Sequence, residues 1–257
     1  MSEYVLPHEL KGEQQRLRLM AALLDPMERR HLEDVGLRQG WRCLEVGCGI
    51  GSISQWLAEK VGPSGHVVAS DIDVTYLGGL PASCLKIRRL DILRDEIEVN
   101  AYDLVVCRAV LHHLADAQMA VQHMITALKP GGILLSIEPD MLPCTVAEPE
   151  VMRGFWQGWL KWSEKAGIDY FIGRKISQWL DAAGLEDVGG AGHTALFNGT
   201  SDWARYWTMS IRELAPTLLK SGHVTERMLD QFFVLYQEPH YWTSVITFTA
   251  SWGRKPV

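Results

Sequence analysis

The sequence lacks the features that mark membrane and secreted proteins. None of its 257 residues belong to an apolar run that approaches the roughly 18 residues of a membrane span. The segment from Met1 to Gln15 is polar and has no apolar centre, so we expect no signal peptide. These absences predict a cytoplasmic protein that makes no membrane contact.

Cysteine is scarce, and its spacing is irregular. The five cysteines are an odd number and form no CxxC pair, which argues against a structural zinc site and against a disulfide framework. We therefore expect buried thiols in a reducing compartment, and no bound metal.

Positive charge is also in short supply. The formal net charge is −6, and the short basic clusters are Arg29-Arg30 and Lys86 to Arg89. Proteins that bind nucleic acids gather Lys and Arg to neutralise phosphates, and the second cluster fits a solvated strand face. We expect a small-molecule substrate and no nucleic-acid partner, while a homodimer remains open.

What the sequence does contain is a regular alternation of strand and helix patterns from Trp41 to Glu138. Short connections between these segments imply parallel pairing with right-handed crossovers, which predicts a doubly wound α/β sheet. The predicted strands are Arg42 to Val46, His66 to Ser70, Leu85 to Leu90, Tyr102 to Cys107 and Ile133 to Ile137.

Helical patterns flank this alternation on both sides. At the amino end, Glu9 to Leu24 predicts one helix, and Asp25 followed by Pro26 suits the N-cap and first turn of a second. After residue 140 the predicted elements are helices at Glu148 to Ala166, Arg174 to Ala183, Ser201 to Leu219 and Thr225 to Tyr236, and strands at Leu185 to Phe197 and Trp242 to Trp252. We expect a helical lid over 1–39, an α/β core over 40–140, and sheet completion with helical cap insertions over 141–257, all in one domain.

The strongest motif is LEVGCGIG at 44–51, between the first strand and the following helix. Its glycines let the backbone turn sharply and approach a ligand closely, although nicotinamide dehydrogenases use a similar turn. The dehydrogenase pattern would place its third glycine at Ser52. Glu45 would repel a pyrophosphate but attract a ligand ammonium group. Asp71, at the end of the second strand, can accept hydrogen bonds from two ribose hydroxyls.

Five blocks in order resemble the class I S-adenosylmethionine-dependent methyltransferases, and most closely the bacterial small-molecule group related to ubiquinone and menaquinone methyltransferases. The blocks are LEVGCGIG at 44–51, VVASDID at 67–73, RLDI at 89–92, YDLVVCRAVLHHLAD at 102–116 and LKPGGILLSIEPD at 128–140. The resemblance implies a seven-stranded Rossmann-like fold, S-adenosylmethionine as cofactor and methyl transfer as activity. The short second crossover, where Gly78-Gly79 and Pro81 follow Val74 to Leu77, departs from the pattern.

The resemblance also implies a set of cofactor-binding residues. Asp71 would bind the ribose, Ile72 would pack on the adenine, and Asp91 would accept from the adenine amino group, unless it caps a turn. The full set is Glu45, Gly47, Gly49, Gly51, Asp71, Ile72, Asp91, Ile92 and the backbone near Cys107.

Candidate catalytic residues follow the fourth and fifth strands. His112 and His113 are adjacent, so they point in different directions on a helical turn. His113 matches a position common in the family, so we take His112 as the candidate general base; a structural role for both is the alternative. Glu138 and Asp140 would point into the same cleft, or would stabilise the turn around Pro139.

Further candidates form a substrate lid. The amino-terminal segment resembles the lid helix of related enzymes, with Tyr4, His8 and Arg16 at the matching positions, although a solvated helix face is the alternative. Trp156 and Trp203 are candidate walls of an apolar pocket, and core packing is the alternative for each. Such a pocket would select a hydrophobic or aromatic small molecule.

The leading hypothesis is methyl transfer to O, N or C of a small molecule. One alternative is a fold relative that binds the cofactor without transferring methyl, such as a pericyclase or a regulator. A nicotinamide-dependent oxidoreductase is a further alternative, against which Glu45 and the glycine spacing argue.

Overall fold

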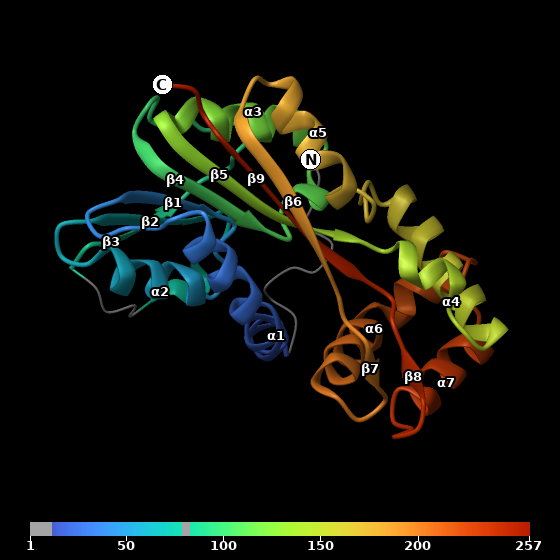
Figure 1. Ribbon diagram of the computed structural model, residues 1–257. Coiled ribbons are helices and arrows are strands. Elements are labelled where there is room, and N and C mark those ends of the chain that lie inside the picture. Colours follow the sequence, from blue (N-terminus) through green and yellow to red (C-terminus); the bar gives the residue numbers. More distant parts are fainter. Residues whose placement is uncertain (1–11, 79–82) are drawn as a thin grey trace.

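A twisted seven-stranded sheet forms the centre of the protein (Figure 1). The computed structural model describes residues 12–78 and 83–257. The strands lie in the order β3-β2-β1-β4-β5-β9-β6, which confirms the predicted doubly wound, mostly parallel α/β fold. Their bounds are β1 (Arg42–Val46), β2 (His66–Asp71), β3 (Leu85–Arg89), β4 (Tyr102–Arg108), β5 (Leu128–Asp140), β6 (Glu186–Thr194) and β9 (Thr247–Arg254).

The sheet topology places three strand ends together. Strands β1 to β5 pair in parallel, whereas β9 runs antiparallel to both β5 and β6. The chain passes from β1 to β2 and β3 on one side, and after β3 it crosses back to β4 on the other side of β1. At that point Val46 pairs with Ser70 of β2 and with Cys107 of β4. Ligands of open α/β sheets bind at such a reversal, outside the carboxyl ends of the strands.

Helices cover both faces of the sheet. Leu57 of α2 shares one core with Leu104, while Val121 of α3 and Ile176 of α5 share the other with Val105. Residues 104 and 105 are consecutive in β4, so the two cores follow from the alternation of side chains along a strand. The helices are α1 (Glu13–Asp34), α2 (Ser52–Val61), α3 (Ala117–Ala127), α4 (Glu150–Lys165), α5 (Gly173–Ala182), α6 (Asp202–Lys220) and α7 (Glu226–Leu235).

Helix α1 is continuous, so the prediction of two amino-terminal helices was wrong. Asp25 does not cap a second helix; its carboxylate accepts a hydrogen bond from Arg108 at 3.0 Å. Pro26 lies within the helix, where it removes one backbone hydrogen bond. Ion pairs from Asp25 and Glu28 to Arg108 hold α1 against the sheet on both sides of the proline. These distant contacts are absent from the local pattern on which the prediction rested.

The strand predictions near the carboxyl end also need correction. The predicted final strand is two elements, β8 (Trp242–Thr243) and β9. Strand β8 pairs with β7 (Phe197–Asn198) in a separate two-stranded sheet. Strand β5 extends well beyond the predicted Ile133 to Ile137, because β9 pairs with it as far as Asp140.

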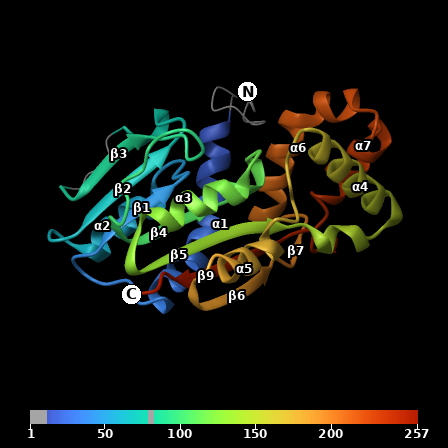
Figure 2. The ribbon, with the colours of Figure 1, turned by 90° about the horizontal axis from the view of Figure 1, so that it is seen from above.

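Helices α4, α6 and α7 gather beyond the sheet (Figure 2), next to the small β7–β8 sheet (Figure 1). They pack around an aromatic centre in which Trp156 meets Trp207 with ring centroids 4.9 Å apart and Phe232 at 6.0 Å. The centre also includes Phe155, Trp159 and Tyr236. Edge-on aromatic contacts of this kind stabilise a core beyond the area they bury.

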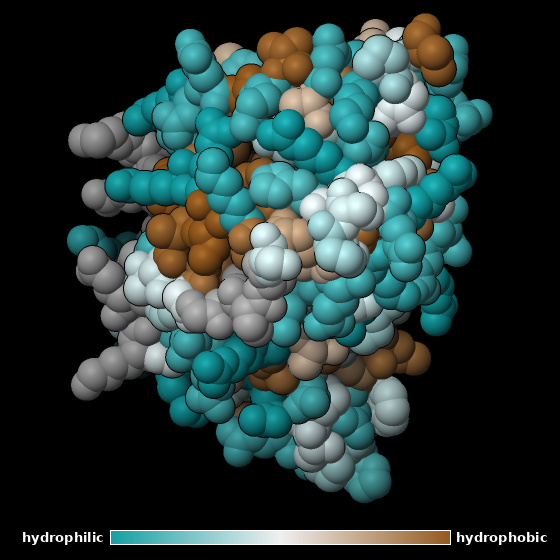
Figure 3. Space-filling model, turned by 90° about the vertical axis from the view of Figure 1, so that its left-hand side faces the viewer, coloured by the Kyte–Doolittle hydropathy of each residue, from teal (hydrophilic) through white to brown (hydrophobic). Residues whose placement is uncertain are grey.

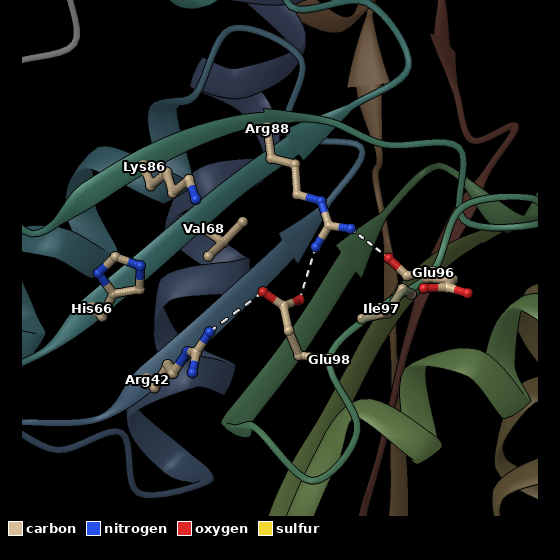
Figure 4. A pocket seen from close by; sticks show the side chains of 8 residues that line it. All are labelled: Arg42, His66, Val68, Lys86, Arg88, Glu96, Ile97 and Glu98. Atoms are coloured by element: carbon tan, nitrogen blue, oxygen red, sulfur yellow. Dashed lines mark hydrogen bonds and ion pairs between the residues drawn. The ribbon is translucent and has the colours of Figure 1, made fainter.

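The connection from β3 to β4 contains no helix, which leaves one face of β1, β2 and β3 open. A groove of about 400 Å³ lies there, lined by Arg42, His66, Lys86 and Arg88. Glu98 bridges Arg42 and Arg88 across it (Figure 4). Arg42 and His66 are the first residues of their strands, so this groove lies away from the carboxyl ends where ligands of this fold bind.

Several bulk predictions can be compared with the structure. All five cysteines are buried and free, which confirms the expectation of buried thiols. Within residues 12–78 and 83–257, no helix is both long and apolar enough to cross a membrane. Seen from the side of β3 and α2, hydrophobic side chains lie in separate patches among hydrophilic ones (Figure 3).

Candidate functional site

The glycine-rich turn leaves β1 where the strand order reverses. Gly47, Gly49 and Gly51 have φ angles of 72°, 55° and 75°, in the left-handed region that favours glycine. A Cβ added at Gly47 would lie 2.1 Å from Cγ2 of Val110, whereas a Cβ at Gly49 would meet no described atom within 4 Å. Gly47 therefore allows close packing, and Gly49 leaves space for a ligand to approach the backbone.

Asp71 fastens this turn to the end of β2. Its Oδ2 accepts a hydrogen bond from the N–H of Gly49 at 2.8 Å, and its Oδ1 accepts one from Asp73 at 3.1 Å. The next residue, Ile72, is 55% exposed although it is a large apolar residue. An acid at the turn followed by an exposed apolar side chain fits a ribose and an adenine ring, so these residues fit the cofactor that the sequence predicts.

The remaining predicted cofactor residues lie on neighbouring strand ends. Asp91 Oδ1 accepts from the N–H of Leu93 at 3.0 Å, which is the turn-capping role considered as its alternative. The side chain of Ile92 is buried in the core, so a ligand can reach only its backbone. The thiol of Cys107 is buried against Ser136, 3.4 Å from its hydroxyl. The Cys107 backbone pairs with Val46, one residue before the end of β4.

A layer of buried charges lies between α1 and the ends of β1 and β4. Glu45 accepts a hydrogen bond from the hydroxyl of Ser54. Arg108 forms ion pairs with both Asp25 and Glu28, and Oε1 of Glu28 has no partner among the described residues. Asp25 also pairs with Arg29 at 3.3 Å, so three carboxylates face the buried guanidinium group of Arg108 and the partly exposed one of Arg29.

This excess of acid changes how the layer ionises. Burial, reinforced by the nearby Glu28, raises the pKa of Glu45 to about 8, and burial also raises the pKa of Glu28. Ionised carboxylates in a buried layer attract a cationic ligand strongly. Sequence analysis found Glu45 but missed Asp25, Glu28 and Arg108, because the contact from Glu28 to Arg108 joins residues 80 positions apart.

Glu138 organises the segment that follows β4. Its carboxylate accepts hydrogen bonds from the backbone N–H groups of Val110 and Leu111 at 2.9 Å and of His112 at 3.3 Å. The same carboxylate lies 3.0 Å from Nδ1 of His112. Glu138 is fully buried, so the prediction that it points into a cleft was wrong. Glu138 instead holds the turn at 110–112 and the ring of His112 in place, since buried backbone N–H groups require an acceptor.

The two adjacent histidines are held uncharged. Burial lowers the pKa of His112 to about 3 and holds that of His113 well below its usual range. Burial raises the pKa of Glu138 to about 7, while the backbone N–H groups favour its anion. We therefore assign the shared proton to Nδ1 of His112, which leaves the lone pair on Nε2.

A small cavity of about 50 Å³ lies next to these histidines. Its wall includes Ala109, which follows the end of β4, Pro139, which is the second-last residue of β5, and residues of α1, α4 and α6. Trp156 and Trp203 do not line it, so their prediction as pocket walls was wrong: both pack against other aromatic rings. The described residues that line it are Arg16, Met20, Ala109, His112, His113, Pro139, Trp159, Tyr170, Tyr206, Trp207, Ser210, Ile246 and Phe248.

Arg16 reaches this cavity from α1 and is already paired. Its Nε and Nη2 each donate to Glu13 at 2.7 Å, and its Nη1 donates to the hydroxyl of Tyr206 at 3.2 Å. Arg16 and Glu13 are only 4% and 2% exposed, so the solvated-face alternative for Arg16 does not hold. Tyr4 and His8 lie outside the described residues.

Comparison with known proteins identifies the family of the chain. Residues 12–189, more than half of the chain, match a family model described as a methyltransferase domain. The demethylmenaquinone methyltransferase of Staphylococcus aureus strain JH9 is 30% identical over 115 residues, which are 43% of this chain and 48% of that protein. The chain thus matches about half the length of this relative.

Solved structures share the fold at low sequence identity. A Bacillus halodurans protein provisionally described as a methyltransferase has a TM-score of 0.60 at 18% identity, over 89% of this chain and 98% of that one. The [4+2]-cyclase SpnF has a TM-score of 0.56 at 18% identity, over 91% of this chain and 81% of that one. A phosphoethanolamine N-methyltransferase of Haemonchus contortus, in complex with S-adenosyl-L-methionine, has a TM-score of 0.55 at 17% identity. That alignment covers 95% of this chain and 52% of that one.

Proposed function

This chain belongs to the methyltransferase domain family, and we propose that it transfers a methyl group from S-adenosylmethionine to a small hydrophobic or aromatic molecule. When bound, this cofactor supplies a methyl carbon that its positively charged sulfur makes electrophilic. The protein's part is to hold both molecules in line and to exclude water, and such positioning can supply roughly 7–11 kcal/mol of the barrier.

One contact carries the proposal, because it joins the glycine turn to the cavity. Val110 packs against Gly47 so closely that no Cβ fits between them, and the residue before it, Ala109, lines the cavity. A cofactor on the turn would therefore lie one residue away from a molecule in the cavity. His112, two residues further on, lines the same cavity.

The geometry of the strand ends supports the cofactor roles that the family resemblance implies. Gly47, Gly49 and the Cys107 backbone would hold the methionyl part, and the buried acid layer around Glu45 would attract its positive charge. Asp71 would bind the ribose hydroxyls, and the exposed Ile72 would cover one face of the adenine. Gly51 would complete the turn, while Asp91 and the Ile92 N–H would border the adenine edge.

On the acceptor side, His112 is the proposed general base. Glu138 holds its Nδ1, which orients the ring and leaves Nε2 for the acceptor. Residues 1–39 would serve as a lid and residues 141–257 as a cap, because α1, α4 and α6 together supply Arg16, Trp159 and Trp207 to the cavity wall.

Cofactor binding without methyl transfer is the second candidate function, since the fold is shared with a [4+2]-cyclase. Incubation of the purified protein with methyl-labelled S-adenosylmethionine and aromatic acceptors separates the two. Labelled product supports the transferase; tight cofactor binding with no labelled product from any acceptor supports the alternative. Thermal stabilisation by NADH but not by S-adenosylhomocysteine would overturn both.

A further inference from the structure

One face of the sheet carries basic side chains near the β3 edge. Arg42 of β1 lies opposite His66 of β2. Lys86 of β3 lies opposite Val68, two residues further along β2, and Arg88 follows Lys86 at the same spacing. Cross-strand partners and residues two positions apart share a face of a sheet. These side chains therefore line one groove, which has a volume of about 400 Å³ (Figure 4).

The groove is open to solvent because no helix joins β3 to β4. The side chains of Arg42 and Arg88 are 39% and 28% exposed, and Lys86 is exposed as well. Beneath them lies apolar surface, since Val68 is almost fully buried and Ile97 also lines the groove. The groove thus combines positive charge at its rim with an apolar floor.

The protein itself holds the two arginines in place. The carboxylate of Glu98 accepts from Arg88 at 2.8 Å and from Arg42 at 3.5 Å. The hydroxyl of Tyr102 donates to the same carboxylate at 2.9 Å, and the guanidinium of Arg42 lies 4.8 Å from the centre of the Tyr102 ring. Side chains that are already ordered lose less conformational entropy when a ligand binds.

Positive charge is in excess in this groove. Within residues 12–78 and 83–257, Lys86 forms no ion pair. The two arginines share the carboxylate of Glu98. Figure 4 shows the carboxylate of Glu96 turned away from these cations, and it is the backbone carbonyl of Glu96 that accepts from Arg88. Three cations therefore face one inward carboxylate, and the excess remains positive when Glu96 is counted.

We propose that the groove binds a small phosphate monoester, at a site separate from the cofactor cleft. Such a group carries a charge of about −1.5 to −2 at pH 7, which suits three cations that share one carboxylate. Its oxygens accept from Lys86 and from the guanidinium of Arg88, whose geometry matches phosphate. The organic part of the ligand covers Val68 and Ile97.

The position of the groove makes the proposal independent of the proposed methyl transfer. Arg42 and His66 begin their strands, whereas the glycine turn and Asp71 lie at the carboxyl ends of the same strands. A ligand in the groove therefore does not compete with one in the cofactor cleft. The alternative is that the long basic side chains only shield the apolar sheet face, as the stems of lysine and arginine can do.

The test uses phenyl phosphate as the probe, titrated by calorimetry into the protein saturated with S-adenosylhomocysteine. We expect a dissociation constant below about 1 mM. Phenol lacks the phosphate and inorganic phosphate lacks the ring, so each should bind at least about fivefold more weakly.

Two variants and a matched control locate the site. Lys86→Gln and Arg88→Gln should each weaken binding of phenyl phosphate about fivefold or more. Lys60→Gln removes the same charge from an exposed position on α2, over the other face of the sheet, and should bind like the original protein. Lys86 forms no ion pair with the described residues, so Lys86→Gln should fold normally and decides the test if Arg88→Gln does not fold.

The proposal is overturned if phenyl phosphate binds more weakly than expected, or if phenol or inorganic phosphate binds as tightly. An unchanged affinity in Lys86→Gln, or an equal loss in Lys60→Gln, would also overturn it. A hexa-aspartate peptide that binds more tightly than phenyl phosphate would assign the groove to an acidic protein segment instead. None of these outcomes bears on methyl transfer, which label transfer measures separately.

Discussion

The two sides of the candidate site treat charge differently. On the cofactor side, Asp25, Glu28 and Glu45 lie near Arg108, and Asp25 also pairs with the partly exposed Arg29. On the acceptor side, Arg16 is matched by Glu13, and the histidines are neutral. Both sides are buried and polar, so burial alone does not decide what each binds. The two sides differ in the group that can change its charge. Burial raises the pKa of Glu45 to about 8, so a cation on the cofactor side would favour its ionisation, whereas burial holds the histidines of the acceptor side neutral.

Replacing the proposed base should have the largest effect. It should lower the rate of methyl transfer without changing cofactor binding. His112→Ala should lower the rate of methyl transfer about 10²–10⁴-fold, with the affinity for S-adenosylhomocysteine unchanged. In the original protein saturated with cofactor, the rate should fall as the pH drops below about 7. Burial holds the pKa of His112 at about 3, so the ring stays unprotonated, but burial raises the pKa of Glu138 to about 7, and its protonation removes the anion that orients His112. Label transfer and calorimetry measure the two quantities, with His240→Ala as control. Equal loss of rate and affinity would contradict the separation of the two sides.

Two glycine substitutions probe the turn at Gly47 and Gly49, which joins the cofactor side to the acceptor side through Val110. Gly47→Ala places a Cβ 2.1 Å from Val110, so we expect a loss of about 1–3 kcal/mol in the free energy of unfolding together with weaker cofactor binding. Gly49→Ala meets no such clash and should weaken cofactor binding with a smaller loss of stability. Chemical denaturation and calorimetry distinguish the two; equal stability losses would show that Val110 does not constrain the turn.

The buried acids on the cofactor side predict that cofactor affinity depends on pH. Because burial raises the pKa of Glu45 to about 8, its carboxyl group is protonated at neutral pH and ionises as the pH rises through that value. Affinity for the cationic S-adenosylmethionine should therefore rise about threefold to tenfold across this range, and binding below it should release a proton. Glu45→Gln should abolish the dependence, whereas Glu59→Gln, on α2, should keep it. A persistent dependence in Glu45→Gln would assign the titration to another group.

The smallest expected effect concerns the ribose contact. Asp71→Ala removes the acceptor of the Gly49 N–H and would also remove the proposed hydrogen bonds with two ribose hydroxyls, so the affinity for S-adenosylhomocysteine should fall several-fold. Asp73→Ala, two residues further along, is the matched control and should bind normally. An unchanged affinity in Asp71→Ala would remove Asp71 from the cofactor site.

The cofactor side could be predicted because its geometry is local. Gly47, Gly49 and Gly51 fall within five residues, and a strand followed by a helix fixes how such a turn lies. Asp71 is 22 positions from Gly49, yet it reaches it because the end of a neighbouring parallel strand lies beside the turn. Strand order and side-chain alternation were enough to bring these residues together.

The acceptor side could be predicted only in part. The sequence indicated His112, but the contact with Glu138 spans 26 positions and depends on the register between β4 and β5. Trp156 and Trp159 lie on one face of α4, and helical spacing cannot tell which of them meets the cavity. The packing of α6 and α7 against that face buries Trp156 in the aromatic centre and leaves Trp159 at the cavity wall.

The sequence by itself determined the α/β alternation, the glycine turn and the acids at the strand ends, because these depend on side-chain period and backbone freedom over a few residues. Only the tertiary structure decided which charges are compensated. Arg108 meets Glu28 across 80 positions, and Tyr206 meets Arg16 across 190. Ionisation and charge balance depend on neighbours in space and on depth from solvent, and neither is written in the spacing of residues along the chain.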